Sequence, residues 1–405
     1  MRHRFALQNP QSLLHLFRNE SLSINFDEVD EAQVWALAGL AALSRDEARS
    51  ISVQLGGSTS GRFAEALGFR SVCQGDPPNQ TSALKRTFKL RRFRLLDEVP
   101  SLAADIAQLV VPDTDSHDAQ RTVQYVLTEL LRNTVQHAHD SLGGVVAAQR
   151  MDEGFKGYAK SVVQVVVADA GVGIWEALRG HHPSLGDANA ALMKSIEPHI
   201  SGTFHEGLTG TAWNAGMGLF MLSEIAKHTA GRMLIASRGA AITIQGDLEN
   251  ESKPRFEFVP PPSTGFPGTL VAFELPLENV HNHEGLVELI REKARTRTPQ
   301  RDASQWIRLE VPPKGTKCFP VLPFREDVAR AQKLARETLM PMLLARESFE
   351  LDFVNVTFCT QSFAHALLFE VSRVSWALKV PIYVTNAAPA VTTAIRFVDS
   401  YAQGG

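Results

Sequence analysis

The sequence contains few cysteines, little excess charge and no long apolar run. Its three cysteines, Cys73, Cys318 and Cys359, are scattered, which indicates a reducing cytoplasmic compartment and no cysteine-bound metal cluster. The formal net charge of −3 gives no general attraction to nucleic acid or to anionic membranes, so nucleic acid is not expected as a partner. No apolar run approaches the roughly 18 residues of a membrane span, and the N-terminus has no signal-peptide core. We therefore expect no membrane association.

The composition is that of an ordinary globular protein, with 44% hydrophobic and 21% charged residues. A chain of 405 residues suggests two to three domains, each large enough for its own core. Histidines gather loosely at His181, His182, His199 and His205 but lack the spacing of metal ligands. Solvated loop histidines are therefore favoured over a zinc site.

The segment Arg121–Asp140 has the pattern of an amphipathic helix, because its apolar residues recur at steps of three and four. Glu129, Asn133 and His137 are spaced four apart, so they share one face of that helix at the edge of the apolar stripe. Polar groups there cost desolvation energy unless they have partners. Two interpretations follow: an ordinary helix rim with hydrogen bonds, or a carboxylate, an amide and an imidazole that face one pocket.

A strand followed by glycines comes next. Ser161–Ala168 is a β-branched run suited to a buried strand, and it leads into Asp169-Ala-Gly171-Val-Gly173. Glycines at such a strand end let a backbone turn pass close to a flat ligand while the carboxylate offers an acceptor.

Two further glycine segments follow in the chain. Gly216 and Gly218 precede an apolar-periodic stretch that begins at Leu219, and glycines before a helix leave backbone N–H groups available for phosphate. Gly268 and Thr269 then open a strand that runs to Pro276. Each motif is weak alone, but the helix and the three glycine segments in this order are a strong combination.

This ordered set resembles the ATP-binding module of the histidine-kinase-like (GHKL) ATPases, over about Leu96 to Leu277. That family includes sensor histidine kinases, anti-sigma-factor serine kinases, gyrase-type topoisomerases, mismatch-repair ATPases and ninety-kilodalton heat-shock chaperones. The resemblance implies that Asn133 binds a Mg²⁺ ion bridging the ATP phosphates and that Asp169 accepts from the adenine amino group. It implies that the glycines shape a lid and its hinges, and that Thr269 supports the adenine. The nucleotide-binding residues implied are Asn133, His137, Asp169, Gly171, Gly173, Gly216, Gly218, Leu219 and Thr269.

The family divides at the position four residues before the asparagine. Its hydrolases and anti-sigma kinases carry a glutamate there as general base, whereas sensor histidine kinases commonly have an amide. Glu129 occupies this position, one helical turn from Asn133, which favours hydrolysis or transfer to a hydroxyl. His137 resembles the histidine of anti-sigma kinases, and a contact with phosphate and a place in the pocket wall both stay open for it.

The flanking segments read as small α/β domains. Residues 1–95 alternate strand and helix over Leu22–Phe26, Ala32–Leu43, Ile51–Leu55 and Arg62–Leu67, with a faint resemblance to the sulfate-transporter/anti-sigma-antagonist (STAS) class. Residues 84–95 interleave basic and aromatic side chains, which fits single-stranded nucleic acid binding or, as we favour, an edge strand guarded by cations. Within the module, we expect His181–Trp213 to be a long irregular lid and 246–267 a loop. Between them, Gly231–Ile235 and Ala241–Gln245 read as a hairpin across Ser237, Arg238 and Gly239.

The C-terminal part begins with a linker at 281–305, for which we expect a solvated helix and joint, followed by a STAS-like α/β domain at 306–405. Asp352–Phe363 resembles the strand–turn–helix of STAS antagonists. There Thr360 replaces the acidic residue, Gln361 replaces the phosphorylated serine, and Ser362 is expected to be a helix N-cap. Phosphorylation of Thr360 or Ser362 is the less favoured alternative.

The fold expected from the sequence is α/β, an α+β sandwich of the histidine-kinase-like ATPase type at 96–280 flanked by two small STAS-like domains. The leading functional hypothesis is a cytoplasmic switch that binds ATP and Mg²⁺, closes its lid, changes contacts with a protein partner or a second protomer, and resets by slow hydrolysis through Glu129. One alternative is an anti-sigma-type serine/threonine kinase acting on a STAS-like partner. Another is a non-enzymatic scaffold that nucleotide stabilises. Such domains occur together in stress signalling and in phage defence, which is an association of families rather than an inference from residues.

Overall fold

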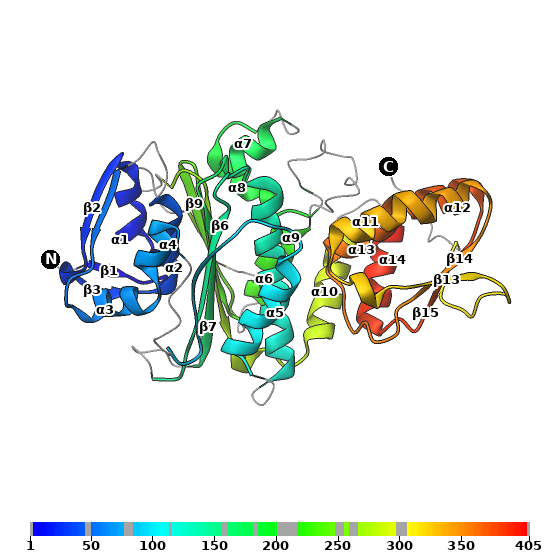
Figure 1. Cartoon of the computed structure of the whole chain (residues 1–405), viewed down its shortest axis with the longest axis horizontal. Helices are drawn as coiled ribbons and strands as arrows, with labels where there is room; N and C mark the ends of the chain where they lie inside the picture. The colour runs from blue at the N-terminus through cyan, green and yellow to red at the C-terminus, as the bar shows by residue number, and fades with distance from the viewer. Residues whose placement is uncertain are drawn as a thin grey trace. The chain divides into compact units, whose positions relative to one another are not determined.

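The computed structural model is a mixed α/β protein and describes residues 3–44, 50–76, 84–112, 116–154, 160–180, 185–198, 200, 217–247, 255–258, 266–296 and 306–402 (Figure 1). Its contacts divide the chain into two compact units. The first comprises Met1–Ser195 and Leu222–His281, and the second comprises Ile196–Met221 and Asn282–Gly405. Among the described residues, no helix has both the length and the apolar character needed to cross a membrane.

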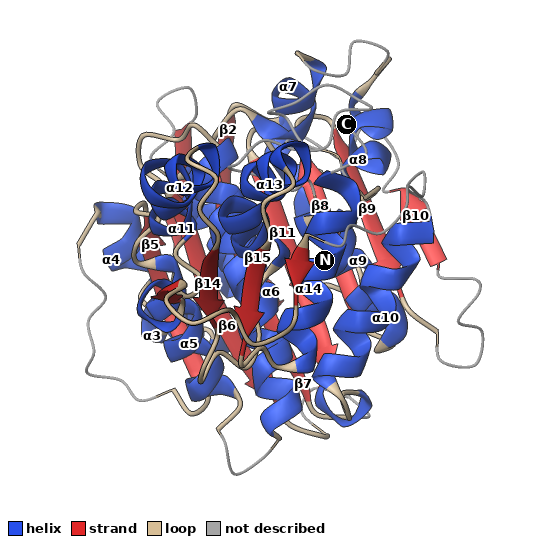
Figure 2. Ribbon diagram, turned by 90° about the vertical axis from the view of Figure 1, so that its right-hand side faces the viewer, coloured by secondary structure: helices blue, strands red, loops and turns tan. Residues whose placement is uncertain are grey.

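A seven-stranded sheet forms the centre of the first unit, in the order β10-β9-β8-β11-β7-β6-β5 (Figure 2). Every neighbouring pair in it is antiparallel. Its strands are β5 (Thr87–Phe93), β6 (Gly144–Met151), β7 (Val162–Asp169), β8 (Arg232–Ser237), β9 (Ala240–Gln245), β10 (Arg255–Phe258) and β11 (Thr269–Pro276). The predicted strands at Ser161–Ala168 and Gly268–Pro276 and the predicted hairpin of β8 and β9 are confirmed. The loop prediction for 246–267 is wrong at β10, which pairs with β9.

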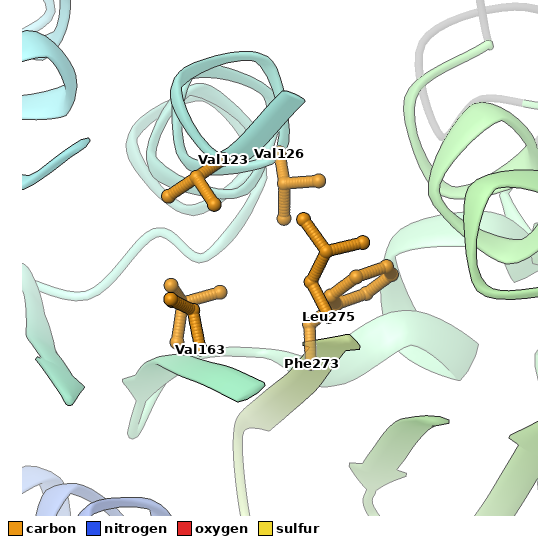
Figure 3. Close-up of a pocket in the computed structure, with 6 residues that line it drawn as sticks. Val123, Val126, Val163, Phe273 and Leu275 are labelled. Atoms are coloured by element: carbon orange, nitrogen blue, oxygen red, sulfur yellow. The ribbon is translucent and has the colours of Figure 1, made fainter. Parts of the chain in front are cut away.

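Helices α5 (Val99–Val110) and α6 (His117–His137) cover one face of this sheet (Figure 1). The helix predicted at Arg121–Asp140 is confirmed as α6, and it begins where the Ser116 hydroxyl accepts a hydrogen bond from the Ala119 amide at 3.2 Å. Near the N-terminal half of α6, Val123 and Val126 meet Val163, Val165, Phe273 and Leu275 of the sheet (Figure 3). No space for a water molecule remains between them, so this part of the face is filled with hydrocarbon.

The opposite face of the sheet is covered by α2 (Val34–Leu43), in which every residue is buried. This helix packs on β6 and β7, and one core cluster joins residues of the N-terminal segment to residues of β6, β7, β8, β9 and β11. Gln164 of β7 adds polar links, because its side-chain amide donates to Gln33 at 3.0 Å and to Glu274 at 2.9 Å. The segment before residue 95 therefore shares its core with the sheet.

Short elements surround α2. Parallel pairs form between β1 and β3 and between β2 and β4. The elements are β1 (His3–Phe5), α1 (Gln11–Leu14), β2 (Ser21–Asn25), β3 (Val29–Ala32), β4 (Ser50–Gln54), α3 (Thr59–Ala66) and α4 (Phe69–Gln74).

The basic segment at 84–95 contains β5, which is an edge strand of the seven-stranded sheet, so the edge-strand prediction is confirmed. Two of its arginines are engaged within the protein: Arg91 pairs with Glu98 at 3.0 Å and Arg92 donates to the Ala41 carbonyl at 2.8 Å. Their guanidinium groups serve to hold this edge against α5 and α2.

The second unit has a four-stranded parallel sheet in the order β12-β15-β14-β13. Helix α11 runs into α12 through a widened π turn at Ala335–Leu339, just before Pro341, which has no N–H for a regular helical bond. The elements are α10 (His283–Thr296), β12 (Ile307–Arg308), β13 (Lys317–Pro320), α11 (Val328–Leu334), α12 (Met340–Leu344), β14 (Phe349–Asp352), α13 (Gln361–Leu378), β15 (Ile382–Thr385) and α14 (Pro389–Ala402).

Two predictions for this unit are wrong. The helix expected in the linker is confirmed as α10, but its expected solvation is wrong, because Val287, Ile290 and Arg291 are buried. Arg291 also donates to the carbonyls of Ala390 and Cys359 at 2.8 and 2.9 Å. The N-cap of α13 is Thr360 rather than Ser362. The Thr360 hydroxyl accepts from the Phe363 amide at 3.3 Å and donates to Glu326 at 2.6 Å, so Ser362 lies inside the helix.

If α2 and the sheet form one core, a substitution that destabilises α2 should also destabilise β7. We expect Leu37→Ala, a fully buried position, to cost about 2–5 kcal/mol and to raise amide hydrogen exchange in both α2 and residues 162–169. Leu95→Ala, at a side chain that is 59% exposed, is the control and should change neither. An increase in exchange confined to residues before 45 would show that the two parts unfold separately.

Candidate functional site

Three polar residues lie in a row across neighbouring strands at one end of the seven-stranded sheet. Thr269 of β11 stands opposite Asp169 of β7 on one side and opposite Ser237 of β8 on the other. Directly opposed residues project from the same face of a sheet. Because side chains alternate along a strand, this face is also that of Val165 and Phe273, which pack against α6. The row therefore continues the α6 face beyond its hydrocarbon-filled part.

Asp169 is the most deeply placed member of the row, with 2% of its surface exposed. Its Oδ1 accepts hydrogen bonds from the Gly171 amide at 2.9 Å and the Thr269 amide at 3.2 Å. Within the described part of the chain its Oδ2 accepts none. Burial raises the pKa of Asp169 from 3.8 to about 7; the two amide bonds oppose this rise and the nearby Asp140 carboxylate adds to it. This carboxyl group therefore titrates near neutral pH.

The loop after β7 is fastened to the C-terminal end of α6. The Val172 amide donates to the Ala138 carbonyl at 2.8 Å, and the Ala170 amide donates to Asp140 at 2.9 Å. A Cβ on Gly171 would lie 2.0 Å from the Ala138 carbonyl oxygen, so only glycine permits this approach. Gly173 has φ +77° and begins α7 (Gly173–Arg179). Asp169 and the last turn of α6 are thus held together.

Ser237 joins the loop after β7 to the start of β11. Its hydroxyl accepts from the Ile174 amide at 2.8 Å, donates to the Gly268 carbonyl at 2.9 Å and lies 3.5 Å from the Thr269 hydroxyl. Sequence reasoning placed this serine only in a hairpin turn and missed its role, because its partners are distant in the chain. The adjacent Arg238 is exposed, and its guanidinium lies 3.4 Å from the Gly171 carbonyl.

On α6, the candidate base is buried in an ion pair that the sequence analysis did not predict. A carboxylate oxygen of Glu129 lies 3.4 Å from the Arg132 guanidinium, and each side chain is only 1% exposed. Arg132 is thus the charge partner of the carboxylate expected to act as general base.

Asn133 and His137 follow one and two turns after Glu129 and are half-buried. They lie on the part of α6 that leads to Ala138, where the loop after Asp169 is attached. Burial, together with the nearby His139 imidazole, lowers the pKa of His137 to about 4. His137 is therefore neutral at physiological pH and can offer a hydrogen bond but no positive charge.

The second glycine segment is described only in part. Gly216 lies outside the described residues, while Gly218 and Leu219 begin α9 (Gly218–His228). Of the predicted lid at His181–Trp213, the part at Ala188–Ser195 is a helix, α8, that packs on α7, β8 and β9, so the prediction of an irregular connection is wrong there. The four histidines at 181, 182, 199 and 205 lie outside the described residues.

The donor set at this end of the sheet suits Mg²⁺ held largely by a ligand's own oxygens. In the described ranges, no group of three or more His, Cys, Asp and Glu side chains could hold a metal ion. Asn133 offers one amide oxygen, and Mg²⁺ is commonly bound by few protein ligands together with phosphates. The C-terminal end of a helix is its negative pole, which favours a cation.

Comparison of the chain with protein-family models, with curated protein sequences and with solved structures gives no match.

The raised pKa of Asp169 has a consequence for stability. The folded protein keeps this proton up to about pH 7, whereas the unfolded chain releases it near 3.8, so this group lowers the free energy of unfolding as pH rises between those values. Asp169→Asn keeps the Oδ1 acceptor and cannot titrate. We expect its stability relative to the parent to increase with pH across this window, by up to about 4 kcal/mol in total.

Urea denaturation of the full chain at several pH values measures this difference. Asp105→Asn, at an exposed position of α5, is the matched control and should differ from the parent by a constant amount. A pH-independent difference for Asp169→Asn would show that this carboxyl group titrates normally.

Proposed function

We propose that the first unit binds ATP with Mg²⁺ at the Asp169 end of the sheet, as the resemblance to histidine-kinase-like ATPases implies. The observation that carries this proposal is the buried Asp169 carboxylate, with Oδ1 fixed by two backbone amides and Oδ2 left as an acceptor. In this proposal, residues 96–280 together with the edge strand β5 are the ATPase-type sandwich, the segment before β5 is a STAS-like part that shares its core with the sheet, and the segment 306–405 is a STAS-like module.

The base-binding part would consist of Asp169 and Thr269. An adenine amino group is a hydrogen-bond donor, and the Asp169 side chain offers acceptors alone, with no competing O–H donor, when it is ionised. Fixing Oδ1 with two amide bonds orients Oδ2 without loss of side-chain freedom on binding. The Gly171 turn, which approaches α6 closely, would let the base lie against backbone.

The phosphate-binding part would lie along the last turns of α6. Asn133 would hold the Mg²⁺ ion, which supplies the positive charge that neutral His137 lacks. Glu129, one turn earlier, would orient and deprotonate the attacking water. Because Glu129 is buried beside Arg132, water reaches it only after local rearrangement, which fits slow turnover rather than rapid hydrolysis.

These features favour a slowly hydrolysing regulatory switch in the cytoplasm, in which nucleotide alters contacts with a protein partner or a second protomer. The kinase alternative would need an acceptor hydroxyl. Thr360 is fully buried and donates to Glu326, and Ser362 is 6% exposed inside α13, so neither favours phosphorylation within this chain. A separate STAS-like partner stays the alternative substrate, and a nucleotide-stabilised scaffold stays the alternative without chemistry.

Calorimetric titration with ATP and Mg²⁺ tests the binding proposal. We expect the parent to bind, and Asp169→Asn to lose roughly 100-fold or more in affinity, because the amide presents a donor to the adenine amino group. Asn133→Ala should weaken ATP binding when Mg²⁺ is present and should change it little when a chelator removes the metal. Parent affinity should fall about tenfold per pH unit below about pH 7, as Asp169 takes up its proton. Equal ATP affinity for Asp169→Asn and parent would contradict the site.

Hydrolysis is tested with γ-labelled ATP. We expect Glu129→Gln, which keeps the side-chain shape, to bind ATP as the parent does and to release phosphate roughly 10²–10⁴-fold more slowly. Free phosphate from the parent indicates a hydrolase, and label retained on protein indicates a kinase. If Glu129→Gln released phosphate at the parental rate, the assignment of Glu129 as general base would be wrong.

A further inference from the structure

We infer that Ser237 is a positioning residue that fixes the Thr269 hydroxyl as a hydrogen-bond acceptor and thereby makes the site select 6-amino over 6-oxo purines. This inference rests on the proposed nucleotide site and assigns the source of its base specificity. Ser237 itself is 3% exposed and acts through Thr269 rather than by touching the base.

The hydrogen bonds of Ser237 leave no freedom in the use of its proton. A backbone amide can only donate, so the Ser237 oxygen accepts from Ile174 at 2.8 Å. A backbone carbonyl can only accept, so the single hydroxyl proton of Ser237 goes to Gly268 at 2.9 Å. The Ser237 hydroxyl therefore has no proton left to donate, while its oxygen keeps one lone pair that can accept another hydrogen bond.

The Thr269 hydroxyl lies 3.5 Å from that oxygen, on the adjacent strand. Because Ser237 has no second proton, a hydrogen bond between the two hydroxyls requires Thr269 to donate. The Thr269 oxygen then has only lone pairs to offer to any further partner. Without Ser237 the same hydroxyl could rotate and present either a donor or an acceptor.

On the other side of Thr269 stands Asp169, whose Oδ1 accepts the Thr269 amide at 3.2 Å and whose Oδ2 faces no donor from the described residues. The two side chains thus offer acceptors side by side at one strand end. The amino group at position 6 of adenine can donate to both. The carbonyl of a 6-oxo purine is itself an acceptor and could form a hydrogen bond with neither. A polar site left with unpaired groups discriminates strongly against the wrong ligand.

The experiment compares ATP with inosine triphosphate, which has the same ribose and phosphates and carries a 6-oxo group. Affinities of the full chain for both, with Mg²⁺, are measured by calorimetric titration or by displacement of a fluorescent ATP analogue. The parent should prefer ATP. Ser237→Ala should lower the ratio of ATP to inosine triphosphate affinity roughly tenfold, mainly by strengthening inosine triphosphate binding, because the released Thr269 hydroxyl can then donate to the 6-oxo group. Ser50→Ala, at an exposed serine of β4, is the control and should keep the parental ratio.

A double-mutant cycle separates positioning from general structural damage. Thr269→Val removes the hydroxyl and should also lower the ratio, and adding Ser237→Ala to Thr269→Val should lower it no further, because no hydroxyl is left to position. If Ser237→Ala does not fold, because Ile174 and Gly268 lose their partner, Ser237→Cys keeps the shape with a weak donor and acceptor. Its ratio should fall between those of the parent and Thr269→Val.

The outcomes distinguish the two proposals. A parent that prefers ATP, with a ratio unchanged by Ser237→Ala or by Thr269→Val, overturns the role of Ser237 and leaves ATP binding in place. Equal losses of ATP and inosine triphosphate affinity in Ser237→Ala also overturn it, because they indicate general damage to the site. A parent that binds neither nucleotide overturns the proposed function and this inference together.

Discussion

The pair of amide hydrogen bonds to one oxygen of Asp169 is the interaction on which this end of the first unit depends. One bond comes from the loop that follows β7, and the other comes from the first residue of β11. Together they close the strand end around a buried carboxyl group whose burial raises its pKa to about 7. A buried carboxyl group with one oxygen that accepts no hydrogen bond from the described residues destabilises the free protein, which is typical of sites shaped for a ligand rather than for stability.

The remainder of the sheet, among the described residues, explains why the proposed site lies at this end. One face is sealed by α2, which is buried along its whole length, and the other is filled with hydrocarbon where Val123 and Val126 meet the strands. On that second face, the side chains of β7 and β11 include valine and phenylalanine along most of the strand, and Asp169 and Thr269 at its end. This change in side chains, on strands that are otherwise continuous, puts the proposed site at one end of α6.

Long periodic segments could be predicted from the sequence, and long-range partnerships could not. The three- and four-residue steps of α6 and the valine run of β7 show in local pattern. The four residues of β10 and the alanine-containing run of β6 were missed because such segments need a neighbouring strand to define them. The pairing of Glu129 with Arg132 depends on which side of the helix is buried. The three contacts of Ser237 join segments more than 30 residues apart, which no local pattern reveals. Capping by Thr360 rather than Ser362 is decided by the buried Glu326 beside it.

The proposed switch combines a base-binding end that titrates near neutral pH with a candidate general base held in a buried ion pair. Both features follow from removing carboxyl groups from water and giving them different partners. The most direct test is a crystal structure of the full chain with Mg²⁺ and a non-hydrolysable ATP analogue. The account predicts the adenine amino nitrogen about 3 Å from the Asp169 carboxylate, with the metal beside Asn133. A nucleotide bound elsewhere, with Asp169 still lacking a ligand contact, would contradict it.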